Sequence, residues 1–294
     1  MDNMKKTIVV IGSTGAQGKG VVNTLVEEGS FNVRAATRSP EKYSGRANET
    51  VFADLNDLQS LKDAFKDAYG VFVVTDYWAG ADEIFQGKNA VEAAKEAGVK
   101  HFVWSTLPDI GVISNGEFDV PHFSNKSKVD DVVKNAGFRY VTFVEAPFYF
   151  QNLIGPLAPQ EKQDGTTGWT LSLDPTKEAI HWSDINDMGK VVAGAFLQPE
   201  KAGNGNYLAL ATELYSFNDI IEAYKRHGKE YTYTLIPGEI FATVNDRTKE
   251  MKELFGYWEK YTYMGPGSAS RIEIAKEIAT GEYVRFDDWL NQNS

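Results

Sequence analysis

Three glycines near the start of the chain are the residues whose spacing most clearly suggests chemistry. Gly12, Gly15 and Gly18 follow an apolar run at Thr7 to Ile11 and precede a helical pattern at Lys19 to Glu28. The first glycine lets the chain leave a strand sharply, the second removes the Cβ that would block a pyrophosphate, and the third lets a helix and a strand approach closely. Free N–H groups at the start of the helix then favour an anion. The pattern therefore predicts a dinucleotide-binding turn.

The glycine spacing leaves one alternative open. It is G-x-x-G-x-x-G rather than the G-x-G-x-x-G fingerprint, and three glycines in a loop also occur in ordinary tight turns. The context favours the nucleotide site, because a strand precedes the turn, a helix follows it, and a second strand at Val33 to Thr37 arrives at the distance that a βαβ unit requires.

The residues after this second strand indicate which cofactor binds. A site for NAD usually has Asp or Glu there, whose carboxylate accepts hydrogen bonds from the ribose 2′-hydroxyl and repels a 2′-phosphate. This chain has Arg38 instead, followed by Lys42. A planar guanidinium binds phosphate through two parallel hydrogen bonds, and Lys42 adds a point charge. We therefore predict NADP(H) as the cofactor, with two ordinary solvated surface cations as the alternative.

These residues need a parallel sheet to position them. Apolar strand-like runs alternate with helical patterns in the first half of the chain, as a doubly wound sheet with helices on both faces requires. The expected strands are Thr7–Ile11, Val33–Thr37, Thr50–Ala53, Gly70–Thr75, His101–Ser105 and Tyr140–Glu145. The expected helices are Lys19–Glu28, Asp57–Asp67, Asp82–Ala97 and Asn125–Asn135, several of which open on Asp or Asn as N-caps do. The fold class is therefore α/β and Rossmann-type, with its ligand site at the carboxyl ends of the strands.

The pattern changes after Pro147 to polar turns, short aromatic strands and further helices. The expected elements are strands at Gly168–Leu173 and Gly205–Leu210 and helices at Ile185–Leu197 and Ser216–Arg226. We interpret residues 1–147 as an NAD(P)-binding Rossmann domain and residues 148–294 as a smaller α+β lobe for a substrate or a partner. One return to the first domain is expected around residues 179–184.

The composition excludes several classes of function. With 42% hydrophobic residues and 24% charged residues, the chain is typical of a globular protein, and its net charge of −11 argues against a general nucleic-acid-binding surface, although local basic patches stay open. No apolar stretch approaches the roughly 20 residues that cross a bilayer, and Met1 to Lys6 has no signal-peptide pattern, so a cytoplasmic, possibly nuclear, location is expected. Because the chain has no cysteine and four scattered histidines, no metal site is expected.

Several segments occur together in the order found in a known family. They are Gly12–Gly18, Arg38, Thr75–Trp78, His122–Lys126 and Pro147–Asn152, and the similarity runs from Thr7 to the terminal segment Phe286–Leu290. On these residues the chain resembles the NmrA-like family, an atypical branch of the short-chain dehydrogenases. The resemblance implies NADP(H) binding on a Rossmann domain. Several family members are redox-linked regulators that act through protein contacts, and others, including quinone and dye reductases, transfer hydride.

The resemblance also implies roles for individual residues. The pyrophosphate would be surrounded by Gly12, Thr14, Gly15, Ala16, Gln17 and Gly18, with Arg38 and Lys42 at the 2′-phosphate. The adenine would be flanked by Asp54 and Leu55, and the nicotinamide-side ribose would pass Thr75, Tyr77, Trp78 and Lys126. The nicotinamide pocket would be lined by Phe148 and Asn152. Packing between the lobes is the alternative for the aromatic residues Tyr77, Trp78, Phe148 and Tyr149.

One position departs from the dehydrogenase pattern. Catalytic short-chain dehydrogenases have a tyrosine one helical turn before the lysine, and this chain has His122 there, followed by Lys126. Imidazole suits proton transfer near neutral pH, while a lone histidine beside a lysine is more often a packing or surface residue. Ser105 and Thr106 occupy the region of the usual catalytic serine, or they satisfy backbone groups at a strand end.

Two functions are compatible with this combination. A complete phosphate site beside an altered acid site favours an NADP(H)-binding redox sensor, whose cofactor occupancy reshapes the second lobe and controls a protein partner. The alternative is an NADPH-dependent reductase of a quinone-like or related small-molecule acceptor, whose reduced form needs little proton donation. In that case His122 and Lys126 are the candidate catalytic residues.

Overall fold

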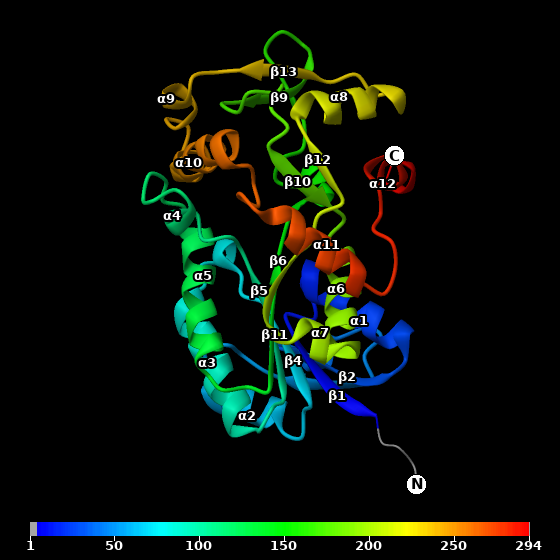
Figure 1. The fold of residues 1–294 in the computed structure, drawn as a ribbon. Helices are drawn as coiled ribbons and strands as arrows, with labels where there is room; N and C mark the ends of the chain where they lie inside the picture. Colours follow the sequence, from blue (N-terminus) through cyan, green and yellow to red (C-terminus); the bar gives the residue numbers. More distant parts are fainter. Residues whose placement is uncertain (1–4, 294) are drawn as a thin grey trace.

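A seven-stranded parallel sheet forms the body of the computed structural model, which describes residues 5–293 (Figure 1). Its strands are β1 (Lys6–Ile11), β2 (Phe31–Thr37), β3 (Glu49–Phe52), β4 (Gly70–Val73), β5 (His101–Thr106), β6 (Tyr140–Glu145) and β11 (Asn204–Ala209). Their order is β11-β6-β5-β4-β1-β2-β3, so the order reverses between β1 and β4. This arrangement confirms the predicted Rossmann-type fold, and its ligand crevice is expected where the order reverses.

Helices cover both faces of the sheet because its central strands are apolar on both sides. One face is covered by α1 (Ala16–Glu28), α6 (Asp187–Leu197), α7 (Pro199–Ala202) and α11 (Ser268–Ile278), and the other by α2 (Leu58–Phe65), α3 (Glu83–Glu96) and α5 (Pro121–Lys134) (Figure 1). Alternate residues of β1 enter different cores: Ile8 and Val10 pack on the α1 side, and Val9 and Ile11 pack on the α2 side. Such burial on both faces is typical of parallel sheets.

The predicted acidic helix starts are present. Asp57 accepts hydrogen bonds from the backbone N–H groups of Gln59 and Ser60 at the start of α2, and Asp82 accepts one from Phe85 at the start of α3. These caps satisfy N–H groups that have no partner within the helix, and they fix where each helix follows its strand.

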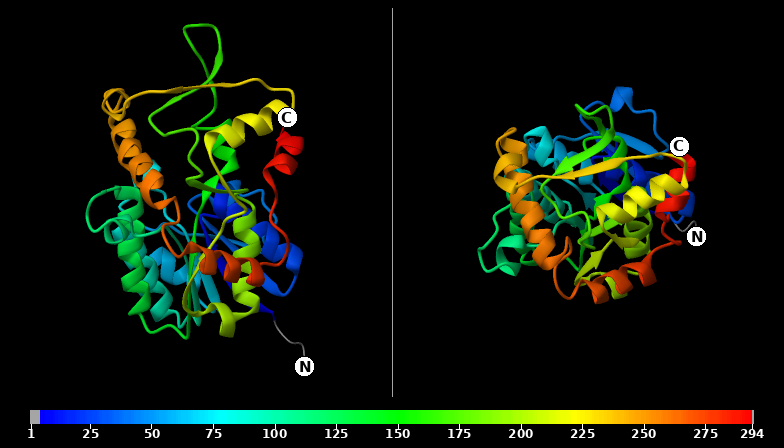
Figure 2. Two further views of the ribbon diagram at one scale, coloured as in Figure 1. Left: turned by 45° about the horizontal axis from the view of Figure 1, so that its top comes forward. Right: turned by 90° about the horizontal axis from the view of Figure 1, so that it is seen from above.

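A smaller assembly lies beyond the carboxyl ends of the main strands, at the top of Figure 1. It contains two three-stranded sheets, one formed by β7 (Phe148–Tyr149), β10 (Ile180–Ser183) and β12 (Glu213–Tyr215), and the other by β8 (Gln160–Glu161), β9 (Thr167–Leu171) and β13 (Thr232–Leu235). Its helices are α8 (Phe217–Arg226), α9 (Gly238–Phe241), α10 (Asp246–Tyr261) and α12 (Phe286–Asn293), while α4 (Ile110–Ile113) lies between β5 and α5 in the chain. The right-hand view of Figure 2 shows the molecule from above Figure 1, with this second lobe toward the viewer.

The strand pairing places two segments differently from the sequence-based expectation. The strand expected in the second lobe at Gly205–Leu210 is β11 of the main sheet, where it pairs with β6 and where Tyr207 stacks on Phe143. The segment 179–184, expected to return to the first domain, instead forms β10 of a small sheet. The chain returns to the main body at α6, which packs on α1. The division at residue 147 stays a prediction.

Two expectations drawn from the sequence concern membranes and targeting. Across residues 5–293, none of the helices has the length and apolar content that spanning a bilayer demands. The segment Met1 to Lys6, which has no signal-peptide pattern, has its first four residues outside the described part of the chain.

Candidate functional site

The glycine turn leaves β1 at the point where the strand order reverses. Gly12 has a positive φ of +71°, and a Cβ there would lie 2.8 Å from a methyl carbon of Val74. A Cβ on Gly18 would lie 2.2 Å from the carbonyl oxygen of Gly12, so the close approach of helix and strand expected at Gly18 is observed. The Gly15 N–H closes the turn by donating to the Gly12 carbonyl at 2.8 Å.

The outer side of this turn is open. Thr14, Gly15 and Ala16 are exposed, and a Cβ on Gly15 would meet only the Gly12 carbonyl oxygen, at 3.3 Å. Gly15 is the N-cap of α1 and offers no side-chain cap, so the first N–H groups of the helix are available to an anion. Gln17 accepts a hydrogen bond from the Ser105 hydroxyl at 2.7 Å. The turn thus has the shape that a pyrophosphate needs.

Two unpaired cations stand beside the turn. Ile11 of β1 is in register with Ala36 of β2, so Arg38 follows β2 next to the point where the turn leaves β1. Arg38 and Lys42 are exposed, and within residues 5–293 neither side chain has a hydrogen bond or an ion pair. The nearby Arg34, by contrast, is bound by the Glu49 carboxylate at 2.8 Å. Arg38 and Lys42 are therefore free to bind a phosphate.

A buried ion pair holds Lys126 at the end of β4. Its Nζ lies 2.8 Å from Glu83 Oε1 and 2.9 Å from both the carbonyl and the hydroxyl oxygen of Thr75. Glu83 is fully buried, and Lys126 is 8% exposed. The three ammonium hydrogens thus face three protein acceptors. The network fixes Lys126 next to the segment where the ribose was predicted to pass.

His122 lies one turn before Lys126 on α5 and is bound by the second lobe. Its Nδ1 is hydrogen-bonded to Glu250 of α10, whose other carboxylate oxygen accepts from the Tyr77 hydroxyl at 3.3 Å. The ring packs against Trp78 with centroids 5.1 Å apart. Burial opposes the charge of Glu250, but the hydrogen bonds and charge of His122 hold the pKa of Glu250 below its usual value. His122 is thus paired with a carboxylate.

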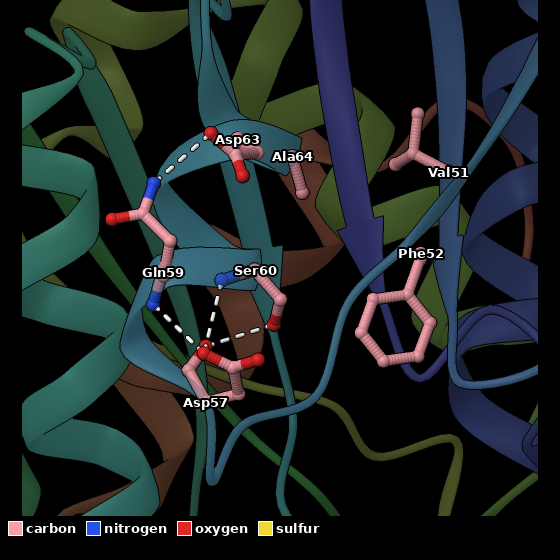
Figure 3. A pocket seen from close by; sticks show the side chains of 7 residues that line it. All are labelled: Val51, Phe52, Asp57, Gln59, Ser60, Asp63 and Ala64. Atoms are coloured by element: carbon pink, nitrogen blue, oxygen red, sulfur yellow. Dashed lines mark hydrogen bonds between the residues drawn. The ribbon is translucent and has the colours of Figure 1, made fainter.

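The predicted adenine side lies after β3. Asp54 accepts hydrogen bonds from the backbone and side chain of Asn56, and the Leu55 carbonyl accepts from Asn89 at 2.9 Å. A shallow pocket of about 410 Å³ opens at the adjacent sheet edge, between β3 and α2 (Figure 3). It is lined by Val51, Phe52, Asp57, Gln59, Ser60, Asp63 and Ala64. None of the predicted cofactor residues lines this pocket, so it forms no part of the candidate site.

The predicted nicotinamide side is dominated by aromatic packing. Phe148 contacts Trp182, Trp258 and Tyr263, with ring centroids 4.9, 5.3 and 6.3 Å apart. Asn152 lies in the short helix that follows β7, and its backbone carbonyl accepts two turn hydrogen bonds. Phe148 therefore has the packing role weighed in the sequence analysis, and its contact with nicotinamide stays a prediction.

Two carboxylates that hold this site were missed by the sequence analysis. Glu83 follows the helix cap Asp82 and looked like an ordinary first-turn acid. Glu250 is separated from His122 by 128 positions, and its own helix has a mixed polar pattern.

The hydroxyl groups near the expected catalytic serine have partners within the protein, since Ser105 donates to Gln17 and Thr106 donates to Asp130. Within the described chain, no group of three or more potential ligands is placed to hold a metal ion.

Comparison with known proteins assigns the chain to a family. Residues 4–290 match the NmrA-like family. The chain belongs to the NmrA-like family. Among its relatives is the nitrogen metabolite repression protein NmrA of Emericella nidulans, 31% identical over 81% of this chain and 70% of that protein. Another is an NmrA-like family domain-containing oxidoreductase, FrzB, of Cladobotryum sp, 29% identical over 77% of this chain and 75% of that protein.

Among solved structures, the chain is similar to NmrA, a negative transcriptional regulator crystallised in complex with NADP. That likeness has a TM-score of 0.80 and 25% sequence identity, and it covers 98% of this chain and 94% of NmrA. The NmrA-like family thus includes proteins named as regulators and proteins named as oxidoreductases.

Proposed function

We propose that this chain binds NADP(H) in the crevice between β1 and β4. The observation that carries the proposal is the pair of exposed, unpaired cations, Arg38 and Lys42, beside an open glycine turn. A pyrophosphate at the turn would accept hydrogen bonds from the start of α1, and the guanidinium would bind the 2′-phosphate. The similarity to NmrA in complex with NADP supports this choice of cofactor.

Titration calorimetry with NADPH, NADP+, NADH and NAD+ tests the cofactor. We expect both phosphorylated forms to bind at least about tenfold more tightly than their unphosphorylated counterparts, since a charge-assisted contact to phosphate is worth about 1.5–3 kcal/mol. Equal affinity for NADPH and NADH would remove the role given to Arg38. No heat with any of the four would remove the site itself.

The function that the site supports best is reduction of a small-molecule acceptor with NADPH. The observation that carries it is the pair formed by His122 and Glu250 at the position of the dehydrogenase tyrosine. A histidine held by a carboxylate is a competent proton donor. A quinone-like acceptor suits this site because hydride transfer would leave a hydroquinone anion that needs one proton, which the pair of His122 and Glu250 would supply. The relative named as an oxidoreductase agrees with this activity.

A screen of NADPH oxidation with quinones, dyes, aldehydes and ketones tests the reaction. We expect turnover with a quinone and a loss of rate in His122→Ala and Lys126→Ala, because His122 would donate a proton and Lys126, bound to Thr75 and Glu83, would hold the segment that the ribose would pass. An unchanged rate in both variants would leave the proposed site without support.

A regulatory function is the second candidate, and one observation favours it. Glu250 of α10 contacts both His122 and Tyr77, so the second lobe is joined to the edge where the cofactor would lie. A ligand that prefers one arrangement of the lobes stabilises that arrangement, which a protein partner can then recognise. Negligible NADPH oxidation together with NADPH-dependent hydrogen exchange in α10 would favour the regulator. Turnover without any change in α10 would exclude it in its pure form.

A further inference from the structure

We propose that Glu250 is a positioning residue that directs the proton of His122 toward the reacting acceptor. The proposal rests on the reductase function proposed above. It adds a second-lobe residue to the chemistry of the site, so that the active arrangement exists only when α10 is docked on α5.

Three hydrogen bonds converge on the Glu250 carboxylate. One oxygen is bound by His122 Nδ1 and also lies 3.3 Å from the His122 backbone nitrogen, while the other accepts from the Tyr77 hydroxyl. The side chains of His122 and Glu250 are 12% and 14% exposed, so the pair is largely screened from solvent. A carboxylate with three donors is held in one orientation, and it holds the imidazole in turn.

The two ring nitrogens of His122 differ in their surroundings. Nδ1 is bound to Glu250, whereas Nε2 has no hydrogen-bond partner within residues 5–293 and is not among the buried polar atoms sealed from solvent. Because a carboxylate oxygen only accepts, Nδ1 must carry a hydrogen whenever this bond is made. Nε2 is then the nitrogen that gives up and takes back a proton.

The other charged and titratable groups near His122 come from four elements. Arg247 of α10 lies over the Trp78 ring at 4.6 Å, and Tyr77 shares Glu250. Lys126, one turn along α5, is neutralised by Glu83 of α3 at 2.8 Å. Lys126 is therefore paired with Glu83, and Glu250 is the carboxylate that is hydrogen-bonded to His122.

The step balances with NADPH as the reductant and a quinone as the oxidant. Bound NADPH would supply a hydride that reduces the quinone by two electrons and would leave as NADP+. The resulting hydroquinone anion takes the Nε2 proton of the His122 imidazolium. His122 is left with its hydrogen on Nδ1, bound to Glu250, and Nε2 is reprotonated from solvent.

A purely structural role for Glu250 is the competing explanation. Helix α5 has no side-chain N-cap of its own, and the contact of Glu250 with the His122 N–H caps it from outside. The experiments must therefore report on the imidazole itself and on the rate of the chemical step. Glu253, an exposed acid on the same helix, supplies a matched control.

The first experiment is ¹⁵N NMR of the histidine side chains in the cofactor-free protein. In the wild type and in Glu253→Met we expect the neutral form of His122 to carry its hydrogen on Nδ1. Glu250→Met, which removes both oxygens, should shift the hydrogen to Nε2, and Glu250→Gln, which keeps one acceptor, should be intermediate. The same tautomer in the wild type and in Glu250→Met would overturn the proposal.

The second experiment is steady-state kinetics with NADPH and 2-methyl-1,4-naphthoquinone. Glu250→Met should lower kcat about 10- to 100-fold, less than the roughly 100- to 10,000-fold that general acid catalysis contributes because His122 itself remains, and should leave the KM for NADPH within about twofold. The double variant with His122→Ala should be no slower than His122→Ala alone, since Glu250 acts through His122. Additive losses, or a raised KM with kcat unchanged, would overturn the proposal and indicate a structural role.

The outcomes separate this proposal from the function on which it rests. A wild-type protein that binds NADPH but reduces no acceptor overturns the role of Glu250 and leaves the regulator standing. A wild-type protein that binds no NADPH overturns the cofactor assignment as well. Thermal unfolding of Glu250→Met identifies a folding defect, and in that case the kinetics of Glu250→Gln decide: a wild-type kcat for this variant overturns the proposal.

Discussion

Arg38 differs from the other arginines near β2 in having no acid to bind. Arg34 is bound by Glu49 and Arg46 by Glu27, whereas the Arg38 guanidinium is exposed and unpaired within the described residues. Because this guanidinium at the end of the second strand has no salt bridge within the described part of the chain, it breaks no ion pair there when it binds an external phosphate. The function of Arg38 can therefore be tested by a substitution, because replacing this side chain leaves no carboxylate of the described residues without its partner.

Arg38→Ala should weaken NADPH binding about 10- to 100-fold, the equivalent of about 1–3 kcal/mol for a charge-assisted contact. NADH binding should stay within about twofold, since NADH has no 2′-phosphate. Calorimetry of both ligands measures the difference. Arg46→Ala, which removes an exposed arginine near the other end of α1, is the control. If Arg38→Ala weakened both cofactors equally, the guanidinium would not contact the phosphate.

Alanine substitutions at two glycines of the turn should have different effects: Gly15→Ala should affect cofactor binding, and Gly18→Ala should affect folding. Gly15→Ala should fold normally, since its φ of −81° suits any residue and its Cβ would meet only one atom, at 3.3 Å. The methyl group would occupy the space needed by the pyrophosphate, so NADPH affinity should fall by at least about tenfold. Gly18→Ala should lower the melting temperature, because its Cβ would lie 2.2 Å from a backbone oxygen. Calorimetry and thermal unfolding separate the two effects; a Gly15→Ala variant with wild-type affinity would contradict the turn assignment.

At the scale of elements, the buried acid Asp130 connects helix α5 with two strands of the main sheet, β5 and β11. Asp130 of α5 accepts hydrogen bonds from Thr106 of β5 at 2.7 Å and Tyr207 of β11 at 2.8 Å. Burial raises the pKa of Asp130 to about 7, against the lowering effect of these two bonds. The folded chain thus holds this proton more tightly than the unfolded chain does. Between about pH 4 and pH 7 the folded state carries more protons, and the free energy of unfolding falls as the pH rises.

Asp130→Asn should flatten this part of the pH dependence. The wild type is expected to lose stability from Asp130 on the order of 4 kcal/mol between pH 4 and pH 7, whereas an amide does not titrate. Denaturant unfolding at several pH values measures the slope. The exposed neighbour Asp131, changed to Asn, serves as a control that should keep the wild-type slope. A wild-type slope in Asp130→Asn would show that the acid is ionised in the folded protein throughout.

The sequence predicted the elements whose patterns are local and failed where partners come from far along the chain. The first six strands and their helices were recognisable because the apolar runs are local and an Asp cap marks the start of α2 and of α3, although α5 begins at Pro121 and not at Asn125. β11 was assigned to the wrong lobe, since no local signal shows that Asn204–Ala209 pairs with β6. For the same reason the sequence pointed to the glycine turn and Arg38 as candidates but not to Glu250, whose contact with His122 exists only where α10 lies against α5.

At the scale of the whole molecule, the last third of the chain is tied to the carboxyl edge of the main sheet. Glu145 ends β6, and Arg271 of α11 binds it at 2.7 Å while donating to the Met264 carbonyl at the same distance. Burial raises the pKa of Glu145, and the arginine counteracts this only in part. The pair spans 126 positions and, together with the Met264 carbonyl, connects the segment that leads from α10 to α11 with the end of β6.

Arg271→Ala should destabilise the protein by about 3–5 kcal/mol, because it leaves the buried Glu145 carboxylate without its cation. The loss should shrink as the pH falls, since a protonated carboxyl group needs no ionic partner, and Glu145→Gln combined with Arg271→Ala should recover part of it. Chemical unfolding at neutral and acidic pH measures both effects. Lys276→Ala, an exposed change on the same helix, should have little effect. If Arg271→Ala were equally harmful at both pH values, lost packing rather than an unpaired charge would explain the loss of stability.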